Sequence, residues 1–236
     1  MNSAEKPAIF AVIPCLNEEK FIAAIVTGAL PHVGRVLVVD DGSTDATSSV
    51  AREAGAEVIS HATRRGAGAA TRSGFEAALQ RGADIVITLD GDGQHNPAEI
   101  PLLLQPLLQD KADLVIGSRF INHETNIPAY RKLGVDFITW MYNLCVKSKV
   151  TDAQSGFRAF SRKLLESIDI THDDFSFSVE VLVKARRKGF RIAEVPVTCL
   201  YHEQGSTSNP VTHGFSVVIA VIGIRLSNVL SGRSKK

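Results

Sequence analysis

Residues 84–95 read DIVITLDGDGQH, an apolar, β-branched run that leads into two carboxylates one residue apart. The run over residues 84–88 has the composition of a buried strand. Asp90 and Asp92 follow where that strand ends, and two unpaired acids this close raise each other's pKa. A hard divalent cation would remove the repulsion, because Mg²⁺ and Mn²⁺ bind carboxylate oxygens together with substrate phosphates. A Gly-Asp turn with solvated acids explains the same residues equally well, so this segment alone leaves both interpretations open.

The length and composition of the chain indicate a soluble globular protein with a real core. Its 236 residues suit one large α/β domain or two small domains, with 44% apolar and 22% charged residues. A net charge of +1 provides no global field for nucleic acid, so we expect no nucleic-acid partner. The three cysteines lack C-x-x-C spacing, which is typical of reduced intracellular thiols. We expect no signal peptide, and no window reaches the roughly 20 apolar residues of a membrane span.

Apolar runs alternate with helical patterns through the first half of the chain. Buried strands are predicted at residues 8–13, 36–39, 57–60, 84–88 and 113–119, and a helix follows each of the first four. Such alternation predicts a parallel sheet with right-handed crossovers, in which ligands bind outside the carboxyl ends of the strands. The residues at that edge are Pro14, Asp40, Asp41, Asp90, Asp92 and Arg119. Independent surface acids would not all gather there, so the metal interpretation gains weight.

A glycine-rich helix start at residues 64–70, RRGAGAA, follows the third predicted strand. It is not a dinucleotide fingerprint, because Thr71 stands where glycine or alanine is needed and the first strand does not precede it. Backbone N–H groups at such a start, beside Arg64 and Arg65, can still receive a phosphate. A tight turn with solvated arginines remains the simpler explanation of the two arginines.

The second half of the chain is less regular. A long helix is predicted over residues 127–148, with an apolar stripe made of Leu133, Phe137, Trp140 and Leu144. We expect this stripe to face the core, and a lipid-facing groove is the alternative. Further predictions are a polar loop at 151–158 leading to residues 159–160 and a short helix, a helix at 175–187, an edge strand at 191–197 and a flexible loop at 201–209.

The C-terminal tail is apolar over residues 215–224 and basic after that. Ten residues are too few to span a bilayer. They could lie in the membrane interface, with the basic end toward anionic headgroups, or pack on the domain as an ordinary helix.

Four motifs in order resemble family 2 glycosyltransferases with a GT-A fold, most of all the dolichyl-phosphate mannose or glucose synthase branch. They are Pro14-x-x-Asn17-Glu18-Glu19, Asp40-Asp41-Gly42-Ser43-x-Asp45, Asp90-x-Asp92-x-Gln94-His95 and Asp152-x-x-Ser155-Gly156-Phe157-Arg158. The resemblance implies a single Rossmann-like, mostly parallel twisted sheet flanked by helices, with an acceptor-side α/β extension. This GT-A domain would cover residues 1–210, and residues 211–236 would form an amphipathic or apolar helical tail.

The same resemblance implies an inverting, metal-dependent transfer of a hexose from GDP-mannose or a UDP-sugar to a polyprenyl or dolichyl phosphate. The implied Mg²⁺ or Mn²⁺ ligands are Asp90, Asp92 and Gln94. The implied nucleotide-binding residues are Pro14, Leu16, Asn17, Glu18, Asp40, Asp41, Arg65, Gly68, Asp90, Gly91 and His202, with a structural role as the alternative for Asp40. The implied catalytic residues are Asp92, Asp152, Arg119 and Arg131, the two arginines binding phosphate through bidentate pairing.

The nature of the acceptor decides whether a base is needed. A phosphate monoester is already anionic near neutral pH, with a second pKa of about 6, so it needs positioning rather than deprotonation. A hydroxyl acceptor would need a base, and Asp152 is the candidate. The alternative role for Asp152 is that of a loop acid that orders Ser155 and Arg158.

Two departures from the family pattern concern phosphate binding. Ala67 stands where many relatives carry lysine, for which Arg64 or Arg65 could compensate, and His202 stands where relatives often carry arginine. Some relatives also carry a membrane domain of two or four spans, which is not found here. We therefore expect peripheral contact with the cytoplasmic face of a membrane. A soluble acceptor, a nucleotide-binding module without turnover and a sugar nucleotidyltransferase are the weaker alternatives.

Overall fold

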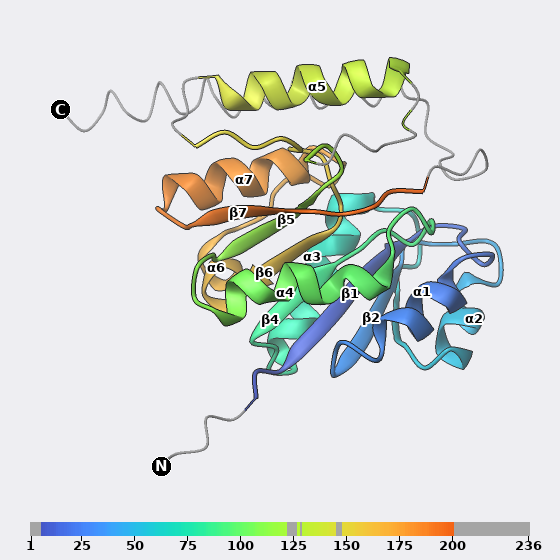
Figure 1. Cartoon of the computed structure of the whole chain (residues 1–236). Helices are drawn as coiled ribbons and strands as arrows, with labels where there is room; N and C mark the ends of the chain where they lie inside the picture. The colour runs from blue at the N-terminus through green and yellow to red at the C-terminus, as the bar shows by residue number, and fades with distance from the viewer. Residues whose placement is uncertain (1–5, 122–126, 128, 145–147, 201–236) are drawn as a thin grey trace, which may run out of the picture.

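A seven-stranded sheet with strand order β3-β2-β1-β4-β6-β5-β7 forms the centre of the protein (Figure 1). This computed structural model describes residues 6–121, 127, 129–144 and 148–200. The strands are β1 (Ile9–Cys15), β2 (Arg35–Asp40), β3 (Glu57–Ser60), β4 (Ile85–Thr88), β5 (Leu114–Ser118), β6 (Arg158–Ser161) and β7 (Ile192–Pro196). The helices are α1 (Ile22–Ala29), α2 (Thr47–Glu53), α3 (Ala67–Gln80), α4 (Ile100–Leu108), α5 (Ala129–Asn143), α6 (Arg162–Ser167) and α7 (Phe177–Arg187), with a short 3₁₀ turn, η1 (Pro97–Glu99).

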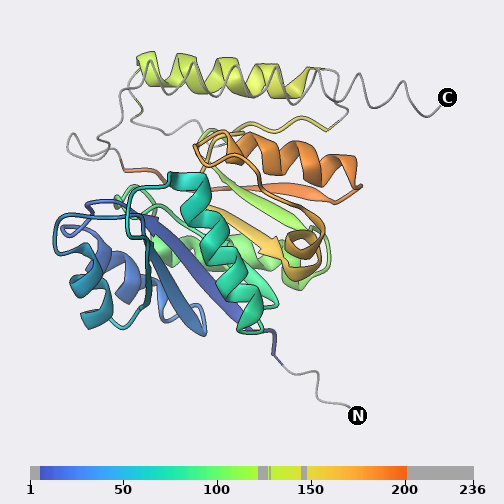
Figure 2. The same cartoon turned by 180° about the vertical axis from the view of Figure 1, so that it is seen from behind.

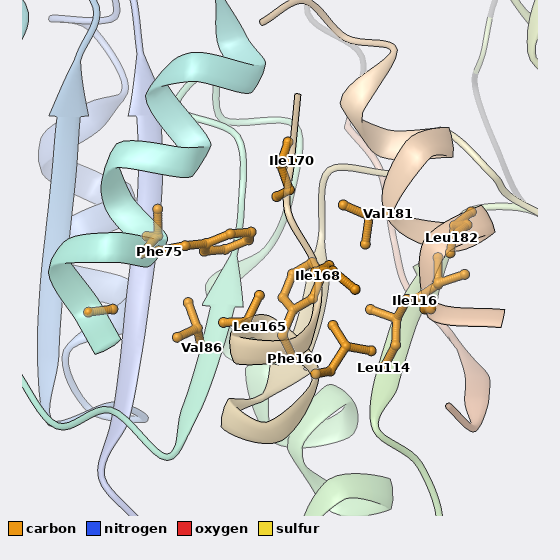
Figure 3. Close-up of a cluster of buried hydrophobic side chains, with 14 of the residues drawn as sticks. Phe75, Val86, Leu114, Ile116, Phe160, Leu165, Ile168, Ile170, Val181 and Leu182 are labelled. Atoms are coloured by element: carbon orange, nitrogen blue, oxygen red, sulfur yellow. The ribbon is translucent and has the colours of Figure 1, made fainter. Parts of the chain in front are cut away.

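Helices cover both faces of the sheet, which is why its central strands are almost entirely apolar. Helices α1, α2 and α4 lie on one face, and α3, α6 and α7 on the other (Figures 1 and 2). On the second face, Phe75 of α3 meets Phe160 of β6 edge to face, with ring centroids 5.0 Å apart (Figure 3). The predicted α/β fold with a mostly parallel sheet is confirmed.

Strand β6 is the element that the sequence interpretation missed. Residues 158–160 were expected to be the end of a polar loop and the approach to a short helix, yet they form an antiparallel strand between β4 and β5. Phe160 pairs with Val86 on one side and with Leu114 on the other. Strand β5 is therefore not a neighbour of β4, but it keeps the direction of β4. Arg119 accordingly lies at the same edge as Asp90, as predicted.

Helix α5 exposes the stripe that was expected to face the core, so that expectation was wrong. Leu133 is 71% exposed, Phe137 49% and Trp140 57%. The buried side of the helix instead carries Ile138 and Tyr142. Periodicity correctly indicated one apolar face, but a second, shorter apolar face makes the contact with the domain.

The last described strand, β7, is an edge strand beside β5, as the proline in its sequence predicted. Within the part of the chain that the structure describes, no helix is long and apolar enough to cross a membrane. The loop containing His202 and the tail at 211–236 lie outside the described residues, so both predictions stand untested.

Candidate active site

The carboxyl ends of β1, β2, β4 and β5 bring the predicted site residues to one edge of the sheet. Cys15 at the end of β1 pairs with Asp40 at the end of β2, and β4 runs parallel to β1 on its other side. The loop after β4 then carries Asp90 and Asp92 across the end of β1. Its glycine is needed for this approach, because a Cβ on Gly91 would lie 2.5 Å from Cys15 Sγ.

Asp92 lies in a strongly acidic environment. Burial and the charge of Asp90 raise its pKa to about 6. Burial raises the pKa of Glu18 to about 7, and the charges of Asp92, Asp45 and Asp90 add to that shift. Gln94 donates to Asp92 through its backbone N–H to Oδ1 (3.1 Å) and through Nε2 to Oδ2 (2.6 Å). Asp90 and Asp92 on the loop after β4 and Glu18 on the loop after β1 repel each other, so a cation would stabilise this site.

Asp90 is held in place from two sides. His95 Nε2 lies 3.3 Å from Asp90 Oδ2, and the buried His95 ring packs beside Phe157. Loss of solvent around Asp90 disfavours its charge, but the contact with His95 and the positive charges of Arg119 and Arg158 outweigh this effect and lower its pKa. On the other side, a Cβ on Gly156 would lie 2.3 Å from Asp90 Oδ2. The position of the Asp90 carboxylate is therefore set by His95 on one side and by the close approach of Gly156 on the other.

The donor set fits a hard divalent cation. Asp90 and Asp92 carry the carboxylate oxygens that Mg²⁺ and Mn²⁺ prefer. Gln94 directs its amide nitrogen at Asp92, so its role as an oxygen ligand stays a prediction. Among the described residues, no three histidine, cysteine or acidic side chains converge into a complete metal cage. An incomplete set is what Mg²⁺ uses when substrate phosphates and water complete its coordination.

The loops after β1 and β2 are joined into one surface. Asn17, in a left-handed conformation with φ of 59°, donates its backbone N–H to Ser43 Oγ (2.9 Å) and accepts the Thr44 N–H at Oδ1 (2.8 Å). Glu18 donates its backbone N–H to Thr47 Oγ1 (2.8 Å). The half-buried Pro14 and Leu16 lie at the start of this surface. The structure thus brings together the four loop residues predicted to bind the base and ribose.

Asp40 and Asp41 both have partners within the protein. Asp40 accepts the Ser43 N–H (2.8 Å) and the Ser48 hydroxyl (2.5 Å). Asp41 is buried and accepts the N–H groups of Arg65 (2.9 Å) and Gly66 (2.7 Å), with His61 Nδ1 at 2.7 Å. These contacts give both acids a structural role, and a nucleotide contact of either remains a prediction.

The start of α3 already has a backbone acceptor. The N–H groups of Gly68 and Ala69 point to the carbonyl oxygen of Asp173, at 2.8 and 3.3 Å. A Cβ on Gly68 would lie 2.2 Å from the carbonyl oxygen of His172, so close approach of this loop explains the glycine. Phosphate binding by Gly68, and by the exposed Arg65 beside it, stays a prediction.

Arg119 forms its bidentate pair with a carboxylate. Its Nε and Nη2 donate to the two oxygens of Asp152, at 2.6 and 2.9 Å, and Asp152 is fully buried. Burial disfavours the charge of Asp152, but Arg119 outweighs it and lowers the pKa of Asp152. Arg158 does not contact Asp152 through its donors; it donates to the carbonyl oxygens of Ala153 and Ser178, each at 2.7 Å. The side chain of Arg131, and His202, lie outside the described part.

Several residues that shape this site were given no role from the sequence, although the family motifs contain two of them, His95 and Gly156. His95 and Gly156 fix Asp90, and Cys15 lies under Gly91. The close packing around the glycines is a property of the folded chain, and only the glycines themselves signalled it.

The sequence matches the family "Glycosyl transferase family 2" over residues 10–169. It is 33% identical over 248 residues to a UDP-N-acetylglucosamine–dolichyl-phosphate N-acetylglucosaminyltransferase from Methanococcus voltae, covering 94% of this chain and 98% of the relative. It is 34% identical over 216 residues to an undecaprenyl-phosphate mannosyltransferase from Micrococcus luteus, covering 84% and 86% of the two chains. Among solved structures, glucosyl-3-phosphoglycerate synthase from Mycobacterium tuberculosis, in complex with Mn²⁺, UDP-glucose and phosphoglyceric acid, superposes with a TM-score of 0.72 at 26% identity. That likeness covers 92% of this chain and 79% of the synthase.

Proposed function

The chain belongs to glycosyl transferase family 2 and is a glycosyltransferase, and on that premise we propose that it moves a sugar from a nucleotide donor to a polyprenyl phosphate. The assignment of a nucleotide-sugar donor is carried by the cluster of Asp90, Asp92 and Glu18 at the sheet edge. The pKa values of Asp92 and Glu18 are raised. The acceptor half is supported by relatives whose names specify dolichyl and undecaprenyl phosphate.

The residues of the donor side have separate tasks. Asp90, Asp92 and Gln94 would hold Mg²⁺ or Mn²⁺. The bound cation would neutralise the charge that develops on the leaving diphosphate. The joined loops at residues 14–18 and 43–47 would bind the base and ribose, through groups such as carboxylates that accept ring N–H donors. Inversion at the sugar carbon is carried over from the family.

The acceptor side of the site favours a phosphate over a hydroxyl. A general base works best with a pKa near the operating pH, whereas Asp152 is fully buried, paired with Arg119 and has a lowered pKa. A phosphate monoester needs no such base. Asp152 therefore serves to orient Arg119, and Arg119 screens the charge of the acceptor phosphate.

A soluble acceptor is the second candidate. It is favoured by the likeness to a solved synthase that holds phosphoglyceric acid, itself a phosphate monoester. Transfer assays with a short prenyl phosphate and with phosphoglycerate, run side by side, separate the two. Transfer to phosphoglycerate alone would reject the lipid acceptor.

Thermal unfolding with and without ligands tests the donor half of the proposal. We expect GDP or UDP to raise the Tm only when Mn²⁺ is present, with a stabilisation of about 2.7 kcal/mol at one hundred times the Kd. Asp92, with a pKa of about 6, and Glu18, with a pKa of about 7, must be ionised to attract the cation. The Tm increase should therefore be large at pH 8 and small at pH 5.5. No increase with either nucleotide at pH 8 would contradict the proposed donor site.

The exposed stripe made of Leu133, Phe137 and Trp140 of α5, together with Leu144 directly after the helix, is the surface proposed to contact the membrane. Helix α5 lies at the outside of the domain, beyond α7 (Figure 1). The rings of Phe137 and Trp140 stack with centroids 6.0 Å apart, and both are about half exposed. An amphipathic helix of this kind binds at the boundary of headgroups and acyl chains. The cytoplasmic side of the membrane stays a prediction.

The single tryptophan of the chain reports this contact directly. We expect the emission of Trp140 to shift to shorter wavelength when vesicles containing anionic lipid are added. Replacing Leu133 and Phe137 with serine should weaken vesicle binding by about tenfold or more, because apolar area is lost. Leu102 and Leu108 on α4 are similarly exposed, so the double serine variant there is the control. Equal binding by the two double variants would remove α5 from the membrane contact.

A further inference from the structure

Glu194 is a charged residue in the middle of strand β7. Ile192 packs on the core of the face that carries α3, α6 and α7, whereas Ala193 and Val195 pack on the opposite face. Side chains alternate along a strand, so Glu194 lies on the same face as Ile192, where it is half-buried. An inward-pointing charge on an edge strand can prevent the strand from pairing with other chains. If this were the role of Glu194, its carboxylate would need no particular hydrogen-bond partner.

The carboxylate of Glu194 nevertheless binds one loop at three points. It accepts the backbone N–H of Thr151 at 2.8 Å, the Thr151 hydroxyl at 3.1 Å and the backbone N–H of Asp152 at 3.1 Å. Thr151 Oγ1 also lies 2.6 Å from the hydroxyl of Ser118. Protection of an edge strand would not need this set of donors, so Glu194 has a specific role in holding the loop.

The loop that Glu194 holds contains one member of the Arg119–Asp152 pair, which lies on the acceptor side of the site. Asp152 receives the bidentate contact of Arg119, and Arg119 also directs its backbone N–H to Asp152 Oδ2 at 3.3 Å. Ser118, which contacts Thr151, directly precedes Arg119. Glu194 therefore contacts both partners of the pair: it holds Asp152 directly at its backbone N–H, and it reaches Arg119 through Thr151 and Ser118.

We propose that Glu194 is a positioning residue for the transfer reaction, which holds Thr151 and Asp152 so that Asp152 keeps Arg119 in one orientation toward the acceptor phosphate. The role of the phosphate rests on the proposed function. The effect of Glu194 on Arg119 does not, because it is present in the protein without ligand.

The first test observes Arg119 in the resting protein. Its Nε–H is identified by NMR as the signal that is lost in Arg119→Lys. In Glu194→Gln, an amide N–H₂ replaces an oxygen that accepts from Thr151, and we expect exchange of the Arg119 Nε proton to accelerate by about tenfold or more as the pair loosens. An unchanged exchange rate would overturn the proposal.

The chain provides a matched control in Glu180. Its carboxylate makes the same clamp elsewhere, accepting the Thr171 N–H at 3.0 Å, the Thr171 hydroxyl at 2.5 Å and the His172 N–H at 3.0 Å. Glu180→Gln should leave the Arg119 signal unchanged even if it lowers the Tm. Equal acceleration in both variants would mean general loosening and would also overturn the proposal. If Glu194→Gln fails to fold, Thr151→Val replaces it, with Thr151→Ser expected to behave as the parent.

The second test uses the reaction. Glu194→Gln should lower kcat/KM for a short prenyl phosphate by about tenfold, as small misplacements in a site do, and leave the affinity for Mn²⁺ with nucleoside diphosphate unchanged. In an Asp152→Asn background, Glu194→Gln should weaken acceptor binding no further, because its effect passes through Asp152. Failure of the parent to transfer would reject the proposed function, while the Arg119 signal would still decide the role of Glu194.

Discussion

Replacing Asp92 with alanine is expected to reduce sugar transfer by about a thousandfold or more, which corresponds to about 4 kcal/mol of transition-state stabilisation. The variant loses a carboxylate that would neutralise, through the bound cation, the charge on the leaving diphosphate. Its fold should remain intact, because burial and the charge of Asp90 make the ionised Asp92 a cost to the metal-free protein. The metal-free Tm should therefore match that of the parent, or exceed it above pH 6.

The assay measures initial transfer rates with and without Mn²⁺, together with the Tm in both conditions. Asp110→Asn is the control, since that carboxylate is 91% exposed and its φ of 50° also suits asparagine. The control should keep the activity of the parent and its Tm increase with Mn²⁺ and nucleotide. Activity of Asp92→Ala above a few per cent of the parent, or parent activity in excess chelator, would contradict the metal assignment.

Strand ends were the most predictable part of this protein. Buried strands such as β2 and β4 are short apolar runs, and the acids after them, Asp40, Asp41, Asp90 and Asp92, had to lie at one edge once the sheet was parallel. The prediction needed only the order of elements and the handedness of the crossovers. It therefore survived the insertion of β6, which changed the neighbour of β4 but not the direction of β5.

The failures concern features that local sequence does not encode. Strand β6 has four residues, beginning with a buried arginine whose partners are carbonyl oxygens of Ala153 and Ser178. No local pattern predicts such a strand, because its stability comes from pairing on both sides. The apolar stripe of α5 had the correct period, but period does not tell which face is covered.

The pairing within the site was equally hidden. Arg119 was expected to bind phosphate, which stays a prediction; its pairing with Asp152, a residue 33 positions away, was not foreseen. The sequence contained both residues as candidates, but the contact depends on the loop that Glu194 holds. The pKa values were only partly predictable. The closeness of Asp90 helps to raise the pKa of Asp92, as expected, but the lowered pKa of Asp90 depends on His95, Arg119 and Arg158, which the fold brings near it.

Replacing Gly156 with alanine is the second variant with a large expected effect. The new Cβ would lie 2.3 Å from Asp90 Oδ2 and 2.4 Å from Oδ1, far inside van der Waals contact. The backbone cannot retreat easily, because Thr88 donates its hydroxyl to the Gly156 carbonyl oxygen at 2.7 Å. The backbone of Gly156 is not left-handed, so alanine adopts it without strain and the effect is purely steric.

We expect Asp90 to be displaced, with Mn²⁺ affinity and transfer each reduced by about a hundredfold, as when a group that orients a metal ligand is lost. Calorimetric titration of Mn²⁺ in the presence of nucleoside diphosphate measures the first, and initial rates measure the second. Gly134→Ala on α5 is the control, because nothing lies within 4 Å of its Cβ and alanine favours a helix.

The Asp90→Ala background separates the collision from other effects of the methyl group. The Gly156→Ala change should lower the Tm in the parent and leave it unchanged in Asp90→Ala, because the carboxylate that the methyl group meets is gone. An equal loss of Tm in both backgrounds would locate the conflict elsewhere in the loop. Unchanged Mn²⁺ affinity in Gly156→Ala itself would contradict the assignment of Asp90 as a metal ligand held between His95 and Gly156.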